Sequence, residues 1–225
     1  MISSKSLEFL KKLKKNNERD WFNANKSEYL ECHENLISFA EELLSEMNKH
    51  DDIANPNGKK CLHRIYRDTR FSKDKTPYKI NWSGGFKRDT ALLRGGYYFH
   101  IAPDASFLAG GFWGPSSDDI KRIREEIHLN GNEFKGVFSS KEFKSNFGEL
   151  LGESLKTAPK GYTTDHPEIE LLRKKQFLVR KSFTDKEVLD GSFTKLAADT
   201  FKAMRPFFDL MSSTLTTNSN GEVIV

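Results

Sequence analysis

The order in which helical and extended patterns follow one another limits the fold of this chain more than any other sequence feature. Apolar residues recur at helical spacing over residues 4–50, give way to a strand-rich stretch at 59–114, and return to helical spacing at 116–175 and 186–213. One further strand is expected at 176–183. Helices segregated before and after a run of strands favour an α+β fold, with a central, mainly antiparallel sheet packed with N-terminal and C-terminal helices. A repeated βαβ unit is disfavoured.

The length of 225 residues suits one large domain or two small ones. We find no internal repeat, linker or low-complexity tract, so we expect a single globular domain over 1–225. Its polar tail, 216–225, is expected to be frayed.

Two segments carry specific local signals. Residues 97–101 and 106–113 read as the two strands of an antiparallel hairpin, joined by a turn in which Pro103 and Asp104 suit the central positions. The pair Gly110–Gly111 in the second strand predicts a bulge or a close backbone approach.

Helix boundaries are also indicated. Ser116 and Asp119 have the spacing of a capping-box variant, which predicts a helix start. Helical fragments are expected to continue to Leu155, and Pro206 predicts a kink or break in the last helix.

The charge of the chain is concentrated in one segment. Its 36 Lys and Arg against 32 Asp and Glu give a formal net charge of +4, a mild excess compared with dedicated nucleic-acid binders. Residues 64–79, which read RIYRDTRFSKDKTPYK, hold six cations against Asp68 and Asp74, and so carry the same +4 as the whole chain. Local charge of this kind binds anions.

The residue types in this segment favour extended structure over 64–71. In such a strand, Arg64 and Arg70 would share one face while Arg67 points to the other. Arginine can hold a phosphate or carboxylate with two parallel hydrogen bonds, and lysines in the following loop could complete a clamp. The predicted ligand-binding residues are Arg64, Arg67, Arg70, Lys73, Lys75 and Lys79.

Catalytic residues are not defined by any motif. His100, on the same strand face as Tyr98, and Tyr78, within the basic segment, are weak candidates. The chain has no phosphate-binding glycine loop, dinucleotide fingerprint or nucleophile elbow, so we predict no cofactor.

A metal site is not predicted either. His63 lies two residues from Cys61, but no second ligand pair supports a metal site there. The two cysteines, Cys32 and Cys61, are expected to be free, buried thiols of a reducing cytosol.

Four stretches resemble one known family. They read FLKKLKKNNERDWFNANKSEY, RIYRDTRFSKDKTPYK, GGYYFHIAPDASFLAGGFWGP and KGYTTDHPEIELLRKKQFLVRKSF. Together they are similar to the conserved hypothetical proteins known as domain of unknown function 2461, roughly from Leu7 to Leu215. The resemblance implies one domain along the chain and supplies no set of catalytic residues.

Three functions remain open at this point. The first is an uncharacterised soluble domain whose basic site binds an anionic, phosphate- or carboxylate-bearing small molecule, and which could be an enzyme. The second is a nucleic-acid-binding protein. The third is a structural or protein-interaction module in which the arginines are neutralised internally. The polar start of the chain and the lack of a long apolar run predict a cytoplasmic location and no membrane partner. The oligomeric state is left open.

Overall fold

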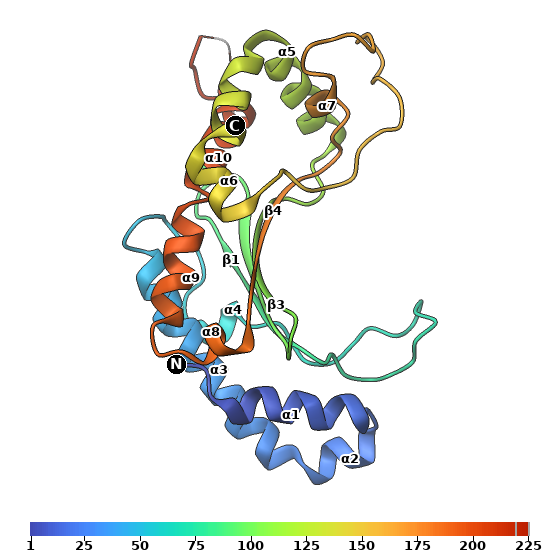
Figure 1. The fold of residues 1–225 in the computed structure, drawn as a ribbon, viewed down its shortest axis with the longest axis vertical. Coiled ribbons are helices and arrows are strands. Elements are labelled where there is room, and N and C mark those ends of the chain that lie inside the picture. Colours follow the sequence, from blue (N-terminus) through green and yellow to red (C-terminus); the bar gives the residue numbers. More distant parts are fainter. Residues whose placement is uncertain (219, 225) are drawn as a thin grey trace. The chain divides into compact units, whose positions relative to one another are not determined.

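The computed structural model describes residues 1–218 and 220–224 and confirms the α+β class (Figure 1). Three helices precede the sheet: α1 (Ser4–Lys15), α2 (Arg19–Ala24) and α3 (Lys26–Met47), followed by the short α4 (Gly58–Cys61). Further helices follow the third strand: α5 (Ser117–Ser139), α6 (Lys141–Phe147), α7 (Ile169–Leu172), α8 (Asp185–Leu189), α9 (Phe193–Lys202) and α10 (Arg205–Thr216). No helix in the described part of the chain is long and apolar enough to cross a bilayer.

The sheet has four antiparallel strands in the order β1-β2-β3-β4. They are β1 (Trp82–Lys87), β2 (Gly96–Ile101), β3 (Ser106–Phe112) and β4 (Phe177–Phe183). Strands β2 and β3 form the expected hairpin, and buried positions alternate with partly exposed ones along both. One sheet face therefore packs into the core while the other keeps side chains such as Tyr98 and His100 within reach of solvent.

The chain divides into two compact units, and each strand contributes residues to both. The first unit comprises Met1–Phe86, Tyr98–Leu108 and Ser182–Asp199; the second comprises Lys87–Tyr97, Ala109–Lys181 and Thr200–Val225. The expectation of a single domain stays a prediction.

Aromatic rings build the core of the first unit. The Phe39 ring meets Phe99 edge-on at 5.6 Å and stacks on Phe193 at 5.8 Å, which joins α3, β2 and α9. The indole Nε1 of Trp82 donates to the Ser6 carbonyl at 3.0 Å, and this bond fixes the start of β1 against α1.

The second unit buries an arginine beside its aromatic core. The Arg88 side chain is 0% exposed and donates to the Asp209 carboxylate at 3.0 Å, the Arg94 carbonyl at 3.0 Å and the Ser212 hydroxyl at 3.2 Å. Its guanidinium also lies 5.6 Å from the centre of the Phe208 ring. These contacts hold the end of β1 and the β1–β2 connection against α10.

The glycine pair in β3 makes the predicted close approach. A Cβ on Gly110 would lie 2.6 Å from the Met204 sulfur, and one on Gly111 would lie 2.1 Å from the Phe177 carbonyl oxygen. Gly111 also has a φ of +133°, which side chains rarely adopt. These positions therefore need glycine.

The predicted boundaries of the later helices hold at two places. Ser116 and Asp119 form the capping box of α5. Pro206 lies in the first turn of α10, so the predicted break separates α9 from α10.

One other sequence expectation is wrong. Helix does not continue to Leu155: α6 ends at Phe147 before Gly148, whose φ is +68°, and Leu151 then pairs with Leu178 of β4. The frayed tail stays a prediction; within it, Thr217 forms a bridge with Val223. Ser219 and Val225, which fall in this predicted tail, lie outside the described residues.

The buried arginine yields a stability prediction. Asp209→Ala should lower the free energy of unfolding by about 2–3 kcal/mol, because Arg88 loses a charge-assisted hydrogen bond that water cannot replace at a fully buried group. Arg205→Ala, which removes the more exposed partner of Asp209, should cost less than about 1 kcal/mol. Urea denaturation of both variants would test this, and equal losses would contradict it.

Candidate basic site on the first unit

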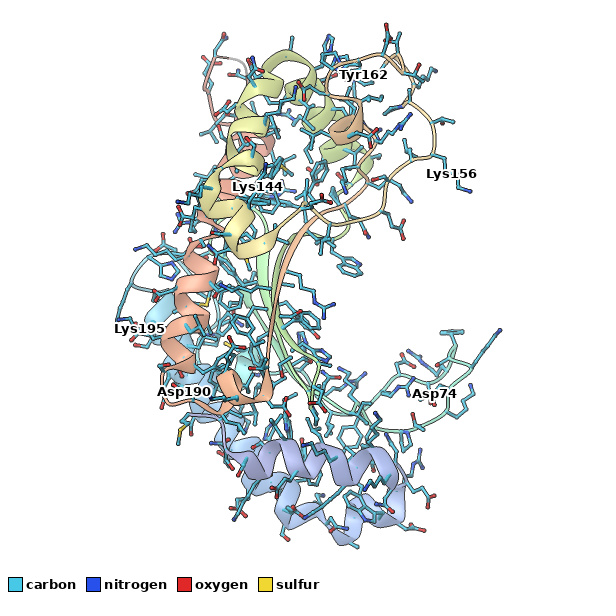
Figure 2. All side chains as sticks on the ribbon, viewed as in Figure 1. Asp74, Lys144, Lys156, Tyr162, Asp190 and Lys195 are labelled. Atoms are coloured by element: carbon cyan, nitrogen blue, oxygen red, sulfur yellow. The ribbon has the colours of Figure 1, made fainter. Side chains whose placement is uncertain are left out.

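The segment predicted to be cationic is a two-stranded ribbon with a loop at its end. Backbone bridges join Leu62 to Gly84 and Tyr66 to Tyr78 in antiparallel register. The Lys79 amide donates to the Ile65 carbonyl at 2.7 Å within the same ribbon. We call residues 64–79 the basic arm; Figure 2 labels Asp74 on the loop of this arm.

The predicted strand over 64–71 is therefore only partly present. Regular pairing stops at Arg67, whose amide donates to the Pro77 carbonyl at 2.9 Å. Beyond it, the Arg70 amide turns back to the Asp68 carboxylate at 3.2 Å. The placing of Arg64 and Arg70 on one strand face is wrong, because Asp68 offers the backbone a local hydrogen bond that competes with the ladder.

Two of the predicted ligand-binding arginines have partners inside the arm. Arg67 bonds the Asp74 carboxylate and the Thr76 hydroxyl. Arg70 holds both carboxylate oxygens of Asp68, at 3.0 and 2.7 Å. Acidic residues of the arm itself therefore neutralise Arg67 and Arg70.

These ion pairs lower the pKa of both carboxyl groups. The Arg67 guanidinium and the amide and hydroxyl of Thr76 lower the pKa of Asp74 to about 2. The side chain of Arg70, then its amide, lowers the pKa of Asp68, to which the charge of Arg64 adds a smaller effect. Asp74 and Arg70 have side chains that are 59% and 77% exposed, so these ion pairs order the loop and contribute little to global stability.

The other predicted cations divide into two groups. Lys75 donates to the Thr69 carbonyl at 2.9 Å, and Lys73 is exposed on the loop. Arg64 and Lys79 lie at the base of the arm, and within the described residues neither has a carboxylate in an ion pair. Burial and then the neighbouring charge of Arg64 lower the pKa of Lys79. The base of the arm therefore holds two positive charges without an ion-pair partner in the described part of the chain, although the charge of Arg64 also acts on Asp68.

Histidine and tyrosine side chains extend this base across the open sheet face. The His63 ring stacks on Tyr98 at 5.9 Å, and its Nδ1 lies 3.5 Å from the Ser83 hydroxyl. The Tyr98 hydroxyl and His100 Nδ1 are 3.2 Å apart, and the His100 ring stacks on Phe107 at 4.7 Å. We call His63, Tyr98 and His100 the ring cluster.

Electrostatics links the ring cluster to the arm. Burial, and then the charge of Lys79, lower the pKa of His63, which favours the neutral imidazole, a group that can donate or accept a hydrogen bond. The predicted placing of His100 and Tyr98 on one strand face agrees with their contact in the structure.

The sequence pointed to His63 only as a possible metal ligand beside Cys61 and gave no sign of its contact with Tyr98.

The two cysteines are free and buried, as predicted. Burial raises the pKa of Cys61 to about 12, which makes it a poor ligand or nucleophile at neutral pH. Within the described residues, no group of three or more His, Cys, Asp and Glu side chains could hold a metal ion.

Tyr78 is an anchor of the arm. It is 4% exposed and its ring stacks on Phe22 of α2 at 4.0 Å. Asn17 donates to its carbonyl at 2.9 Å and accepts from its amide at 3.1 Å. Burial raises the pKa of the Tyr78 phenol, so little phenolate is present to act as a base at neutral pH.

Two cavities border the site. One, of about 300 Å³, is lined by Arg67 and Tyr78 together with Tyr66 and Arg19. The other, of about 670 Å³, lies between α1 and the β2–β3 turn and includes His100. We call it the α1 pocket. The remaining predicted cations line neither of these two cavities: Arg64, Arg70, Lys73, Lys75 and Lys79.

Comparison with known proteins identifies one family. A family model described as conserved hypothetical protein matches residues 5–210, which is most of the chain. No curated protein and no solved structure matches.

The Arg67–Asp74 pair predicts a depressed acid titration. The Asp74 carboxyl should titrate near pH 2, and Arg67→Ala should move its midpoint up toward the ordinary value of about 3.9. Because the folded pKa is lowered, the pair orders the arm above about pH 4, and this contribution is lost as the pH falls toward 2. Carbon-detected NMR of the side chain measures the midpoint. Arg64→Ala, which removes no partner of Asp74, is the control; an unmoved midpoint in Arg67→Ala would refute the link.

The coupling of His63 to Lys79 predicts a second titration change. Removing the ammonium in Lys79→Met should raise the pKa of His63, because the protonated imidazole no longer faces a like charge. NMR of the imidazole protons reports it. Lys75→Met, whose ammonium bonds the Thr69 carbonyl, should leave the titration unaltered.

Proposed function

This chain belongs to the conserved hypothetical protein family DUF2461, and we propose that it binds a phosphate- or carboxylate-bearing anion at the base of the basic arm. Arg64 and Lys79 are the principal contacts. Lys73 and Lys75 add positive charge on the loop, while Arg67 and Arg70 hold the loop in shape through Asp74 and Asp68.

The observation that carries the proposal is the pair of cations that lack an ion-pair partner among the described residues. Lys79 is half-buried, and burial, followed by the charge of Arg64, lowers its pKa and so disfavours its charged form. An anion placed against both would remove the repulsion and gain charge-assisted hydrogen bonds. The backbone of the arm therefore holds Arg64 and Lys79 in place for an anion before the anion binds.

The ring cluster gives the site groups that can exchange protons. The Tyr98 hydroxyl and His100 Nδ1 are in hydrogen-bond contact, and the His63 ring lies against Tyr98. If a reaction occurs on the bound anion, Tyr98 and His100 are the general acid and base available, and His100 is favoured over the buried Tyr78.

Pyrophosphate binding measured by isothermal titration calorimetry at low salt tests the proposal. Arg64→Ala and Lys79→Met should each weaken binding at least about tenfold, which corresponds to one lost charge-assisted hydrogen bond. Arg70→Ala removes a cation already paired with Asp68 and should change affinity less than about threefold. Absence of binding to the wild type, or equal loss in all three variants, would overturn it.

One observation supports nucleic acid as a second candidate ligand. Phe71 is 96% exposed on the loop of the arm, with the Arg70 guanidinium 5.9 Å from its ring centre. Tyr66, on the ribbon, is 48% exposed. Exposed rings among cations can stack on unpaired bases.

Fluorescence anisotropy with a single-stranded oligonucleotide at increasing salt tests this candidate. Phe71→Ala should weaken binding by about 1–3 kcal/mol, as expected for one lost base stack, and affinity should fall linearly on a log–log plot against salt. Leu129→Ala, which removes another exposed apolar side chain, is the control. Phe107→Ala is less suitable, because the Phe107 ring stacks on His100. Binding of pyrophosphate without binding of the oligonucleotide would favour the small ligand.

A further inference from the structure

The α1 pocket has several apolar residues in its lining. Leu10, Ile80, Pro103 and Ala105 line it, and its volume of about 670 Å³ falls in the range of small-molecule sites. Ile80 is 40% exposed although it follows the half-buried Lys79. The lining thus offers apolar surface that an aqueous anion such as phosphate alone would not cover.

Lysines form the other wall of this pocket. Lys11, Lys14 and Lys15 lie on one side of α1, at spacings of three and four residues. Lys11 approaches the Asp185 carboxylate at 4.0 Å, whereas Lys14 and Lys15 have no ion pair within the described residues. Cations in a last helical turn are favoured by the helix dipole, which accounts for their place on α1. It does not account for the cavity opposite them. Their methylene stems add apolar surface, and their three positive charges outnumber the one carboxylate in the lining, Asp104, which favours an anionic occupant.

Two residues connect the pocket with the base of the arm. Ile80, which lies opposite Arg64 in the antiparallel register of the Tyr66–Tyr78 bridge, lines the pocket. His100 lines it as well, and its Nδ1 contacts the Tyr98 hydroxyl, whose ring lies against His63 next to Arg64. All of these residues belong to the first unit.

We propose that the ligand is an amphipathic anion, with a phosphate or carboxylate head at Arg64 and Lys79 and an apolar body in the α1 pocket. This inference rests on the proposed function and names the class of its ligand. The head alone would bind weakly, because exposed anion contacts compete with water and salt. Burial of an apolar chain supplies the remaining affinity, since each methylene removed from water adds to binding.

A comparison of hexyl phosphate with inorganic phosphate tests the ligand class. Calorimetry on the full chain should give at least tenfold tighter binding of hexyl phosphate, the effect of burying two of its five methylenes. Ala105→Trp, at an exposed position of the turn that lines the pocket, should abolish this advantage and leave phosphate affinity unchanged. Ala91→Trp, at an exposed alanine that does not line the pocket, is the matched control and should keep the advantage.

The outcomes separate the two proposals. Equal affinities for phosphate and hexyl phosphate would overturn the amphipathic ligand and leave the anion site standing. Loss of binding of both probes in the wild type would overturn both. If Ala105→Trp still bound hexyl phosphate more tightly than phosphate, the hexyl group would lie outside the α1 pocket. That result would overturn the pocket assignment. Binding to vesicles containing phosphatidic acid, without binding of monomeric hexyl phosphate, would also overturn it, because the apolar body would then remain in the bilayer.

Discussion

The stacked rings of Phe22 and Tyr78, 4.0 Å apart, attach the basic arm to the N-terminal helices. Asn17 completes the attachment with two hydrogen bonds to the backbone of Tyr78. Because Tyr78 lies opposite Tyr66 in the ribbon, this one anchor fixes both strands of the arm. The positions of Arg64 and Lys79 follow from it, since each lies within two residues of that bridge.

Some cations of the arm form internal ion pairs and others do not, and the net charge of the segment does not distinguish the two groups. Arg67 and Arg70 hold Asp74 and Asp68, and these pairs shape a loop that has little apolar material of its own. Arg64 and Lys79 form no ion pair within the described residues, and the charge of Arg64 lowers the pKa of Lys79 after burial does. The internal pairs thus use the carboxylates of the segment and leave its positive charge concentrated at the base, where a ligand can neutralise it.

The ring cluster adds groups that can donate or accept protons beside this charge. Burial and then the charge of Lys79 favour the neutral form of His63, and Tyr98 lies between it and His100. An apolar pocket with a lysine wall begins at His100. Positive charge, proton-exchanging groups and apolar surface therefore occur within one unit, which is the combination that an amphipathic anion would use.

Patterns local in the chain determined much of the fold. The aromatic hairpin with its turn, the capping box at Ser116 and the break at Pro206 all follow from short-range rules of backbone conformation and hydrogen bonding. The same rules failed for residues 64–71 and 148–155, where Asp68 and Gly148 turn the backbone away from the element that the neighbouring residues favour. The concentration of charge between Arg64 and Lys79 was also evident from the sequence. Only the tertiary structure decided which cations form ion pairs, that His63 contacts Tyr98, and that the lysines of α1 line a pocket with His100. Those contacts join residues far apart in the chain, and their geometry depends on the packing of whole elements, which spacing along a sequence does not encode.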